Sequence, residues 1–230
     1  MTAFIQEKER LVRCIRMLEQ NSIMDYNGHA SMKIAPDQML INIGNCQRSQ
    51  LTIDDICQID FDGNVIEGQG KPPLEFHLHA GVYKAREDVS AAIHCHPNWS
   101  TVLSTAGLDY LPVYAQGSLV YPLPVLDSPD SINNVNMAKR LTDTLGNRPA
   151  ALMKAHGVVT TGASIIDAFV LLNYLEENAE RQYRANLIGT PYAFTKEELE
   201  LCYEKLYNPG LFLRTWNHFS AKLDGTVYDA

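Results

Sequence analysis

Long hydrophobic runs are missing from this sequence. No apolar stretch approaches the ~20 residues that a membrane-spanning helix needs. Residues 1–20 mix acidic and basic side chains where a signal peptide would have an apolar core. These absences predict a cytoplasmic protein that has no membrane partner.

Paired cysteines and an excess of positive charge are also missing. The five cysteines are scattered and form no CxxC pair, which indicates reduced, mostly buried thiols. Asp and Glu number 27 against 19 Lys and Arg, for a formal net charge of -8. Since a negatively charged chain repels phosphates, nucleic acid is not an expected partner. A local basic pocket could still bind a small anionic substrate.

Repeats, low-complexity segments and flexible linkers are absent too, so residues 1–230 are expected to form one domain. Hydrophobic periodicity and capping signals predict helices over 4–20, 74–86, 97–105, 131–145 and 164–187, and a last helix after Thr195. Strands are expected over 31–34, 39–43, 56–61, 65–67, 89–95, 150–155 and 158–161, with an extended stretch over 119–126. The mixture indicates an α/β or α+β layered sandwich.

A His-x-His pair closes the predicted strand 89–95. Side chains two apart on a strand share a face, so His94 and His96 can present two imidazoles together while Cys95 points into packing. Neutral imidazole is a common ligand of divalent metals. Taken alone, such a pair would more often be two structural polar side chains at a strand end.

A third histidine and an acid strengthen the metal interpretation. His156 follows another apolar strand and precedes Gly157, which lets the backbone turn tightly. A lone histidine there would more often be structural. Together with Glu75, however, two independent strand ends bearing histidine fit a three-histidine site that leaves a coordination position open for substrate.

The three segments Glu75-Phe76-His77-Leu78-His79, His94-Cys95-His96-Pro97 and His156-Gly157 together resemble the class II aldolase/adducin family, over about residues 11–187. The segment Asn27-Gly28-His29-Ala30-Ser31 resembles the substrate loop of that family, which implies substrate contacts from Asn27, Gly28 and His29. The resemblance implies an α/β fold, a three-layer α/β/α sandwich around a mostly antiparallel central sheet. It also implies a homotetramer with active sites at subunit interfaces.

By the same resemblance, one divalent metal per subunit is held by His94, His96 and His156, and Glu75 is the acid/base that also ligates the resting metal. Such a donor set suits zinc, manganese, iron or cobalt. The resemblance further suggests a catalytic role for Tyr114, acting from a neighbouring subunit, although core packing explains this tyrosine equally well. It also suggests that a C-terminal tail from about residue 190, carrying His218 as a substrate contact, packs on a neighbour's site.

Two departures separate this chain from the sugar-phosphate aldolases of the family. Where those enzymes place two serines that help to hold a phosphate, this chain has Pro73-Leu74. The loop after strand 39–43 lacks the aldolase Thr-Gly turn and carries Arg48 and Ser49, which could hold a carboxylate. Both departures favour the family's decarboxylases of hydroxylated aromatic or dienoic acids.

Other readings stay open. His79 lies one helical turn after Glu75 and could orient that acid, whereas His77 is expected to be structural. Residues 176–181 are expected to be a solvated helix face. A phosphosugar aldolase is the main rival function, and a non-catalytic adducin-like interaction protein is the rival from another class. A cupin is disfavoured because residues 97–102 offer no glutamate after His96.

Overall fold

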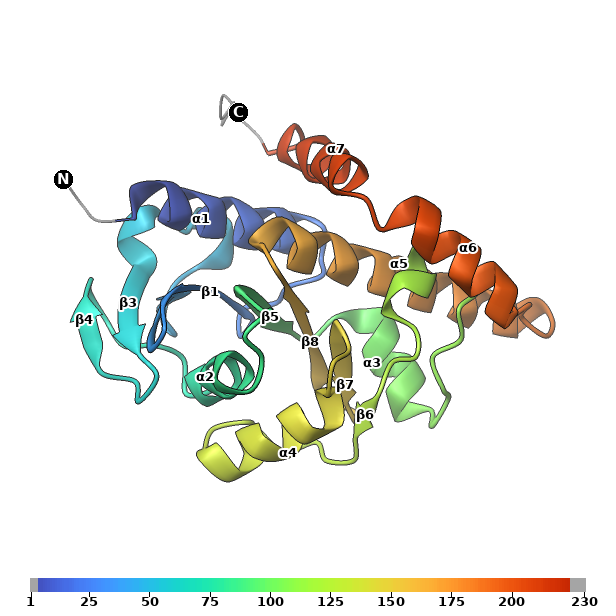
Figure 1. Ribbon diagram of the computed structural model, residues 1–230, viewed down its shortest axis with the longest axis horizontal. Helices are drawn as coiled ribbons and strands as arrows, with labels where there is room; N and C mark the ends of the chain where they lie inside the picture. Colours follow the sequence, from blue (N-terminus) through green and yellow to red (C-terminus); the bar gives the residue numbers. More distant parts are fainter. Residues whose placement is uncertain (1–3, 224–230) are drawn as a thin grey trace.

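The computed structural model describes residues 4–223, which form a mixed α/β structure (Figure 1). The helices are α1 (Ile5–Gln20), α2 (Phe76–Ala85), α3 (Asn98–Thr105), α4 (Val135–Leu145), α5 (Ile165–Ile188), α6 (Lys196–Leu206) and α7 (Pro209–Ser220). The strands are β1 (His29–Ala35), β2 (Gln38–Asn42), β3 (Ile56–Asp60), β4 (Val65–Glu67), β5 (Ala91–Cys95), β6 (Val125–Leu126), β7 (Ala150–Met153) and β8 (Gly157–Gly162). Short 3-10 turns cover Arg48–Gln50, Ile53–Asp55 and Gln116–Val120.

The strands form one eight-stranded sheet in the order β4-β3-β2-β1-β5-β8-β7-β6. Every neighbouring pair is antiparallel except β6 and β7, which are parallel. Strand β5 therefore lies between β1 and β8, and its register pairs His94 with both His29 and Val159. The expected mostly antiparallel central sheet is confirmed.

Helices cover both faces of this sheet, which gives the expected three layers (Figure 1). On one face, α1 and α5 pack with α3 and α7 over side chains such as Ile93 and Cys95. On the other face, α2 and α4 pack over Ala92 and Val159. Because side chains alternate along β5, Cys95 is buried in the first core while Ala92 and His94 face the α2 layer.

Several predicted boundaries shift for local reasons. Helix α4 begins at Val135 rather than near 131, because the Asn134 side chain accepts the Met137 N–H as an N-cap, leaving residues 131–134 as a loop. The stretch 119–126 is mostly not strand: it starts in a 3-10 turn and only Val125–Leu126 pair, because its prolines cannot donate to a ladder.

The C-terminal region holds one helix more than predicted. Thr195 and Glu198 form the expected capping box of α6, but α6 is not the last helix. Asn208 caps α7, which has Pro209 in its first turn and buries Phe212 and Trp216. The end of the predicted tail, residues 224–230, lies outside the described residues.

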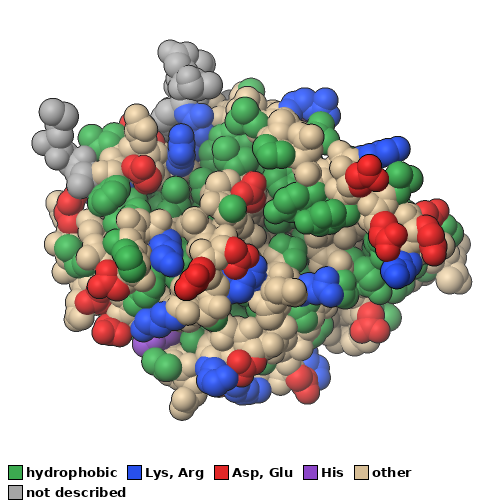
Figure 2. Space-filling view, in the orientation of Figure 1, with side chains coloured by type: hydrophobic (Ala, Val, Ile, Leu, Met, Phe, Trp, Pro, Cys, Tyr) green, Lys and Arg blue, Asp and Glu red, His purple; other side chains and the backbone are tan. Residues whose placement is uncertain are grey.

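Two observations bear on partners. Within residues 4–223, no helix is long and apolar enough to cross a membrane. On the face shown in Figure 2, acidic and basic side chains are interspersed rather than gathered into a patch of one sign.

Candidate metal centre

His94 and His96 lie where β5 ends, on the sheet face that α2 covers. His94 is fully buried and His96 half-buried. Their ring centroids are 4.9 Å apart. The side-by-side presentation predicted from strand alternation is therefore what the structure shows.

His156 reaches the same place from the hairpin between β7 and β8. Its ring centroid lies 5.2 Å from that of His94 and 5.1 Å from that of His96. The left-handed residue of this tight turn is Ala155, with φ 53°, and not Gly157. Gly157 is needed instead for a close approach, since a Cβ there would lie 2.4 Å from the Cys95 carbonyl oxygen and 2.9 Å from His96 Cδ2.

Hydrogen bonds on Nδ1 orient two of the three rings. His94 Nδ1 donates to the Val158 carbonyl oxygen at 2.9 Å. His96 Nδ1 donates to the Asp25 carboxylate, at 3.0 and 3.1 Å from its two oxygens. Carbonyl and carboxylate oxygens can only accept, so a neutral ring keeps its lone pair on Nε2. This is how metal-ligating histidines are held in proteins.

Glu75 immediately precedes α2 and turns its carboxylate toward the histidines. Its Oε1 accepts the Ser131 hydroxyl at 2.9 Å and the Ile132 N–H at 2.8 Å. Its Oε2 lies 3.4 Å from His94 Nε2. Burial alone would raise the pKa of Glu75, but the electrostatic influence of the nearby His29 and His94 side chains outweighs burial and holds the pKa well below its ordinary value.

Glu75, His94, His96 and His156 form a set of four ligands suited to a metal ion. One ligand atom from each lies within 4.8 Å of all the others. His94 Nε2 is buried without a hydrogen-bond partner, which is costly unless something else binds its lone pair. Three imidazoles and a carboxylate fit a divalent transition metal and do not identify which one.

Asp25 is a site residue that sequence reasoning missed. Besides holding His96, its carboxylate accepts the backbone N–H groups of Asn27 and Gly28. Burial would raise the pKa of Asp25, but the hydrogen bonds from His96 and from the Asn27 and Gly28 N–H groups outweigh burial and lower it. Its place three residues before Gly28 is the signal of an Asx turn, which could have drawn attention to it.

The predicted substrate loop is divided between exposed and buried positions. Asn27 is exposed, whereas Gly28 is buried and its carbonyl accepts Arg48 Nε at 2.8 Å. Arg48 is itself buried, and its Nη1 donates to the Cys46 carbonyl at 2.6 Å. Arg48 thus supports the loop from behind, and Ser49 beside it is exposed. Whether these residues contact substrate stays a prediction.

His29 and His79 lie behind Glu75. His29 belongs to strand β1 rather than to a loop, and its Nε2 is 3.5 Å from Glu75 Oε2. Burial lowers the pKa of His29 to about 4. His79 does not orient Glu75 by a direct hydrogen bond as expected; its Nε2 is 2.6 Å from His29 Nδ1 instead.

Tyr114 and His218 lie elsewhere in this chain. The Arg181 guanidinium sits 3.8 Å from the centre of the half-buried Tyr114 ring, and Asn178 of α5 accepts the Tyr114 N–H. His218 is exposed on α7, which packs on the sheet face opposite to α2. Their predicted roles, which need a neighbouring subunit, stay predictions.

The prediction of a solvated helix face over residues 176–181 was wrong for its buried members. Glu176 is 6% exposed, and its carboxylate accepts two N–H groups in the first turn of α3, those of Trp99 and Ser100. The fully buried Asn178 bonds the backbone of residues 111–114. Both side chains hydrogen-bond backbone groups of neighbouring segments that have no backbone partner of their own. The pattern of polar residues along the sequence does not reveal such contacts.

Comparisons with known proteins agree with this geometry. A family model described as the class II aldolase and adducin N-terminal domain matches residues 9–183. An L-fuculose phosphate aldolase of Methanocaldococcus jannaschii is 29% identical over 176 residues, covering 76% of this chain and 94% of that protein. A 3,4-dihydroxyphthalate decarboxylase of Arthrobacter keyseri is 28% identical over 181 residues, covering 70% and 71%.

Solved structures share the fold. An aldolase II superfamily protein from Pseudomonas syringae superposes with a TM-score of 0.84 at 21% identity, covering 97% of this chain and 94% of that one. An L-fuculose 1-phosphate aldolase superposes with a TM-score of 0.81 at 23% identity, covering 90% and 98%. Matched family, fold and ligand set show that the chain belongs to the class II aldolase and adducin family, as a metal-dependent lyase.

Proposed function

We propose that this lyase is a decarboxylase of a hydroxylated aromatic or dienoic carboxylic or dicarboxylic acid. The choice of a decarboxylase over an aldolase rests on the two residues directly before Glu75. Pro73 and Leu74 precede it, and the Leu74 side chain is 80% exposed. Neither side chain can donate a hydrogen bond, so the place where the family's sugar-phosphate aldolases have two serines offers no hydroxyl to a phosphate.

The surroundings of the metal centre also suit a flat, largely apolar acid. A groove of about 360 Å³ runs from His96 along α3. Its lining includes Pro97, Val102 and Ala106 and carries neither lysine nor arginine. The groove would accommodate an apolar ring, whereas an anionic group would have to be held outside it, because a groove without cations offers no charge-assisted hydrogen bonds.

Decarboxylation needs a group that stabilises the developing negative charge and a residue that transfers one proton. A divalent cation held by the three histidines would act as a Lewis acid toward a substrate oxygen. The ionised Glu75 would take the proton of the substrate hydroxyl. The carbon–carboxylate bond then breaks and carbon dioxide leaves. The electron pair of that bond stays on the ring or diene, and Glu75 returns the proton to the carbon that carried the carboxylate.

Hydrogen bonds to Glu75 prepare it for this task. Ser131 and Ile132 hold Oε1, so Oε2 is the oxygen that faces the histidines. Asn27, Gly28 and His29 would line the substrate side of the centre. A second carboxylate would lie near Ser49 and the Nη2 group of Arg48, which makes none of the loop-supporting bonds described above.

The proposal includes a homotetramer in which Tyr114 and His218 complete a neighbour's site. Mixing a Glu75→Gln variant with a Tyr114→Phe variant tests this arrangement. If sites are shared between subunits, the mixture recovers up to about a quarter of wild-type activity in a random tetramer, because some sites receive both intact residues. Recovery of no activity, or a monomeric mass by sedimentation, would contradict the arrangement.

Carbon dioxide release tests the reaction itself. Zn²⁺- or Mn²⁺-loaded protein is incubated with dihydroxyphthalate-type acids, and His94→Ala serves as the inactive form. His77→Ala is the matched control, since that histidine lies outside the four-ligand set and should leave activity intact. Cleavage of a ketose 1-phosphate without any decarboxylation would refute the proposal.

Such an outcome would favour the second candidate, a sugar-phosphate aldolase. That candidate has the support of the 29% identical aldolase relative described above. A purely adducin-like interaction role is disfavoured, because an interaction protein has no need of the complete set of ligands found here.

A further inference from the structure

Four buried side chains form a continuous hydrogen-bonded chain behind Glu75. His29 Nδ1 is 2.6 Å from His79 Nε2. His79 Nδ1 is 2.6 Å from the Ser31 hydroxyl, and the Ser31 hydroxyl is 2.6 Å from that of Tyr83. All four residues are at most 2% exposed. The chain ends at His29 Nε2, which is buried without a hydrogen-bond partner and points at the metal centre.

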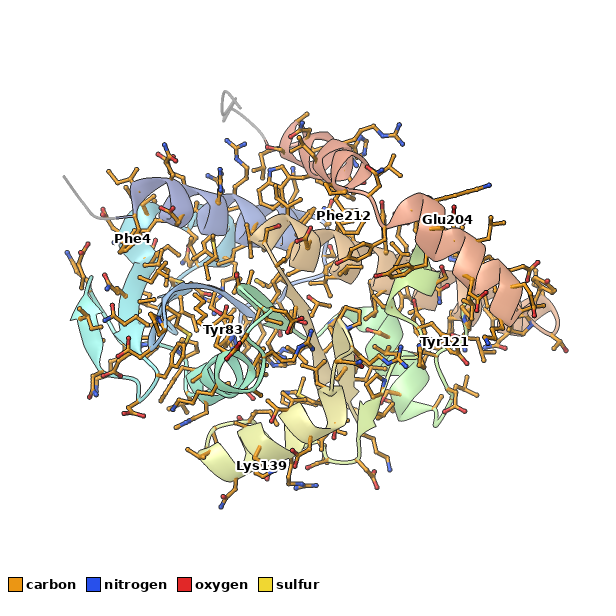
Figure 3. All side chains as sticks on the ribbon, viewed as in Figure 1. Phe4, Tyr83, Tyr121, Lys139, Glu204 and Phe212 are labelled. Atoms are coloured by element: carbon orange, nitrogen blue, oxygen red, sulfur yellow. The ribbon has the colours of Figure 1, made fainter. Side chains whose placement is uncertain are left out.

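Two elements supply the chain, through their regular periods. Glu75, His79 and Tyr83 follow one another at intervals of four, so His79 and Tyr83 share one face of α2 and Glu75 is the N-cap residue before it. His29 and Ser31 alternate on β1 and face α2 across the layer. Figure 3 labels Tyr83 where α2 meets this strand. The chain is therefore built into the contact between helix and sheet.

Its hydrogen bonds can run in either of two directions, and the surroundings favour one. Burial raises the pKa of Tyr83, so its phenol is protonated and can donate to Ser31. Ser31 then donates to His79 Nδ1, and His79 Nε2–H donates to His29 Nδ1. That order leaves the His29 proton on Nε2.

The reverse order would be unfavourable at its metal-facing end. A lone pair on His29 Nε2 would lie 3.5 Å from Oε2 of the Glu75 carboxylate. Two electron-rich atoms would then repel each other in a buried, low-dielectric place. A bound metal would offset the same repulsion for His94, which belongs to the four-ligand set, but not for His29, which lies outside that set. With the proton on Nε2, the same geometry is attractive.

We propose that Tyr83, Ser31 and His79 are positioning residues that lock His29 as a hydrogen-bond donor toward the substrate. Fixing the His29 tautomer in this way gives the four histidines of the site different roles. His94 and His96 are held through Nδ1–H donors, which leaves Nε2 free to ligate. His29 is held through an Nδ1 acceptor, so its Nε2–H cannot ligate a metal and can bind an anionic substrate oxygen instead.

The role of His29 as a donor to substrate rests on the proposed function, since it assumes that the substrate is an acid. The His29 tautomer does not depend on that assumption. Nitrogen-15 NMR of histidine-labelled, Zn²⁺-loaded protein without substrate measures the tautomer directly. We expect His29 to be protonated on Nε2, and Ser31→Ala to produce a mixture of tautomers. Tyr83→Phe should shift the populations in the same direction by less, because Ser31 can still donate.

A matched control is Thr160→Val, which removes a fully buried hydroxyl bonded to the Ala168 carbonyl on the opposite sheet face. It should leave the His29 tautomer unchanged. His29→Gln should still bind one Zn²⁺ per chain. Protonation of wild-type His29 on Nδ1, an unaltered tautomer in Ser31→Ala, or loss of zinc in His29→Gln would each overturn the proposal.

Kinetics then separate this inference from the proposed function. If decarboxylation is found, Ser31→Ala should raise KM for the acid about tenfold, as typical for loss of a supporting residue, with zinc content unchanged. A change in kcat alone would contradict the substrate-donor role. If no decarboxylation is found, the proposed function fails while the NMR result still decides the lock.

Discussion

One carboxylate joins His96 to the loop that leads into strand β1: Asp25 accepts His96 Nδ1–H at 3.0 Å and the Gly28 N–H at 3.0 Å. A shift of that loop would therefore turn the His96 ring. The arrangement links the predicted substrate loop to a predicted metal ligand through a single side chain.

Replacing Asp25 by Asn should weaken metal binding. The amide still accepts a hydrogen bond but carries no charge, so His96 becomes a poorer ligand and Zn²⁺ affinity should fall roughly 10- to 100-fold. Competition with a chromophoric chelator measures this. Asp127→Asn is the control, because that carboxylate pairs with Lys154 on the surface. Equal affinities of the two variants would rule out a supporting role for Asp25.

Removing the Ser131 hydroxyl should slow the reaction without removing the metal. Glu75 Oε1 would lose one of its two donors, and the carboxylate would leave its reactive orientation part of the time. We expect kcat to fall roughly tenfold, measured as carbon dioxide release. Ser128→Ala, whose hydroxyl caps the Asp130 N–H in the same loop, should retain full activity. A Ser131→Ala enzyme as fast as wild type would show that Glu75 needs no such support.

Acid should destabilise the metal-free protein before its carboxylates titrate. The pKa of His29 falls from 6.5 to about 4 on folding, so between these values the unfolded chain binds the extra proton. The free energy of unfolding should therefore be intact above about pH 6.5 and decline as pH falls toward 4, by about 3 kcal/mol in all. Burial lowers the pKa of His79 as well, which adds to the same decline.

Urea unfolding of chelator-treated protein at several pH values measures this decline. His29→Gln should make the pH dependence in that window shallower, because the substituted group does not titrate while His79 still does. A wild-type curve that is flat from pH 7 to pH 4 would contradict the assignment of a buried neutral His29.

Glu176 should matter for stability although it lies on a charged segment. Glu176→Ala removes the acceptor of two α3 N–H groups and should lower the free energy of unfolding by about 1–2 kcal/mol. The neighbouring Glu177→Ala should cost less than about 0.5 kcal/mol, since its partially exposed side chain makes a surface ion pair with Arg181. Equal decreases in the free energy of unfolding of the two variants would contradict a capping role for Glu176.

The local sequence determined much of this protein. Alternation along β5 places His94 and His96 on one face with Cys95 on the other. Glu75 and His79 are four residues apart, which places both side chains on the same side of the helical segment. Turn signals at residues 62–64 and the capping box at Thr195 mark a hairpin and a helix start where the structure has them. These features depend on residues only a few positions apart.

Only the tertiary structure decided which side chains partner the site. Asp25 holds His96 across 71 positions, and Ser131 holds Glu75 across 56. Glu176 supports α3 across 77 positions, where the sequence indicated a solvated face. His29 proved to be a buried strand residue because β1 pairs with β5, and that pairing brings it beside His94. Periodicity determines which face of an element a side chain occupies, but long-range packing determines what that face meets.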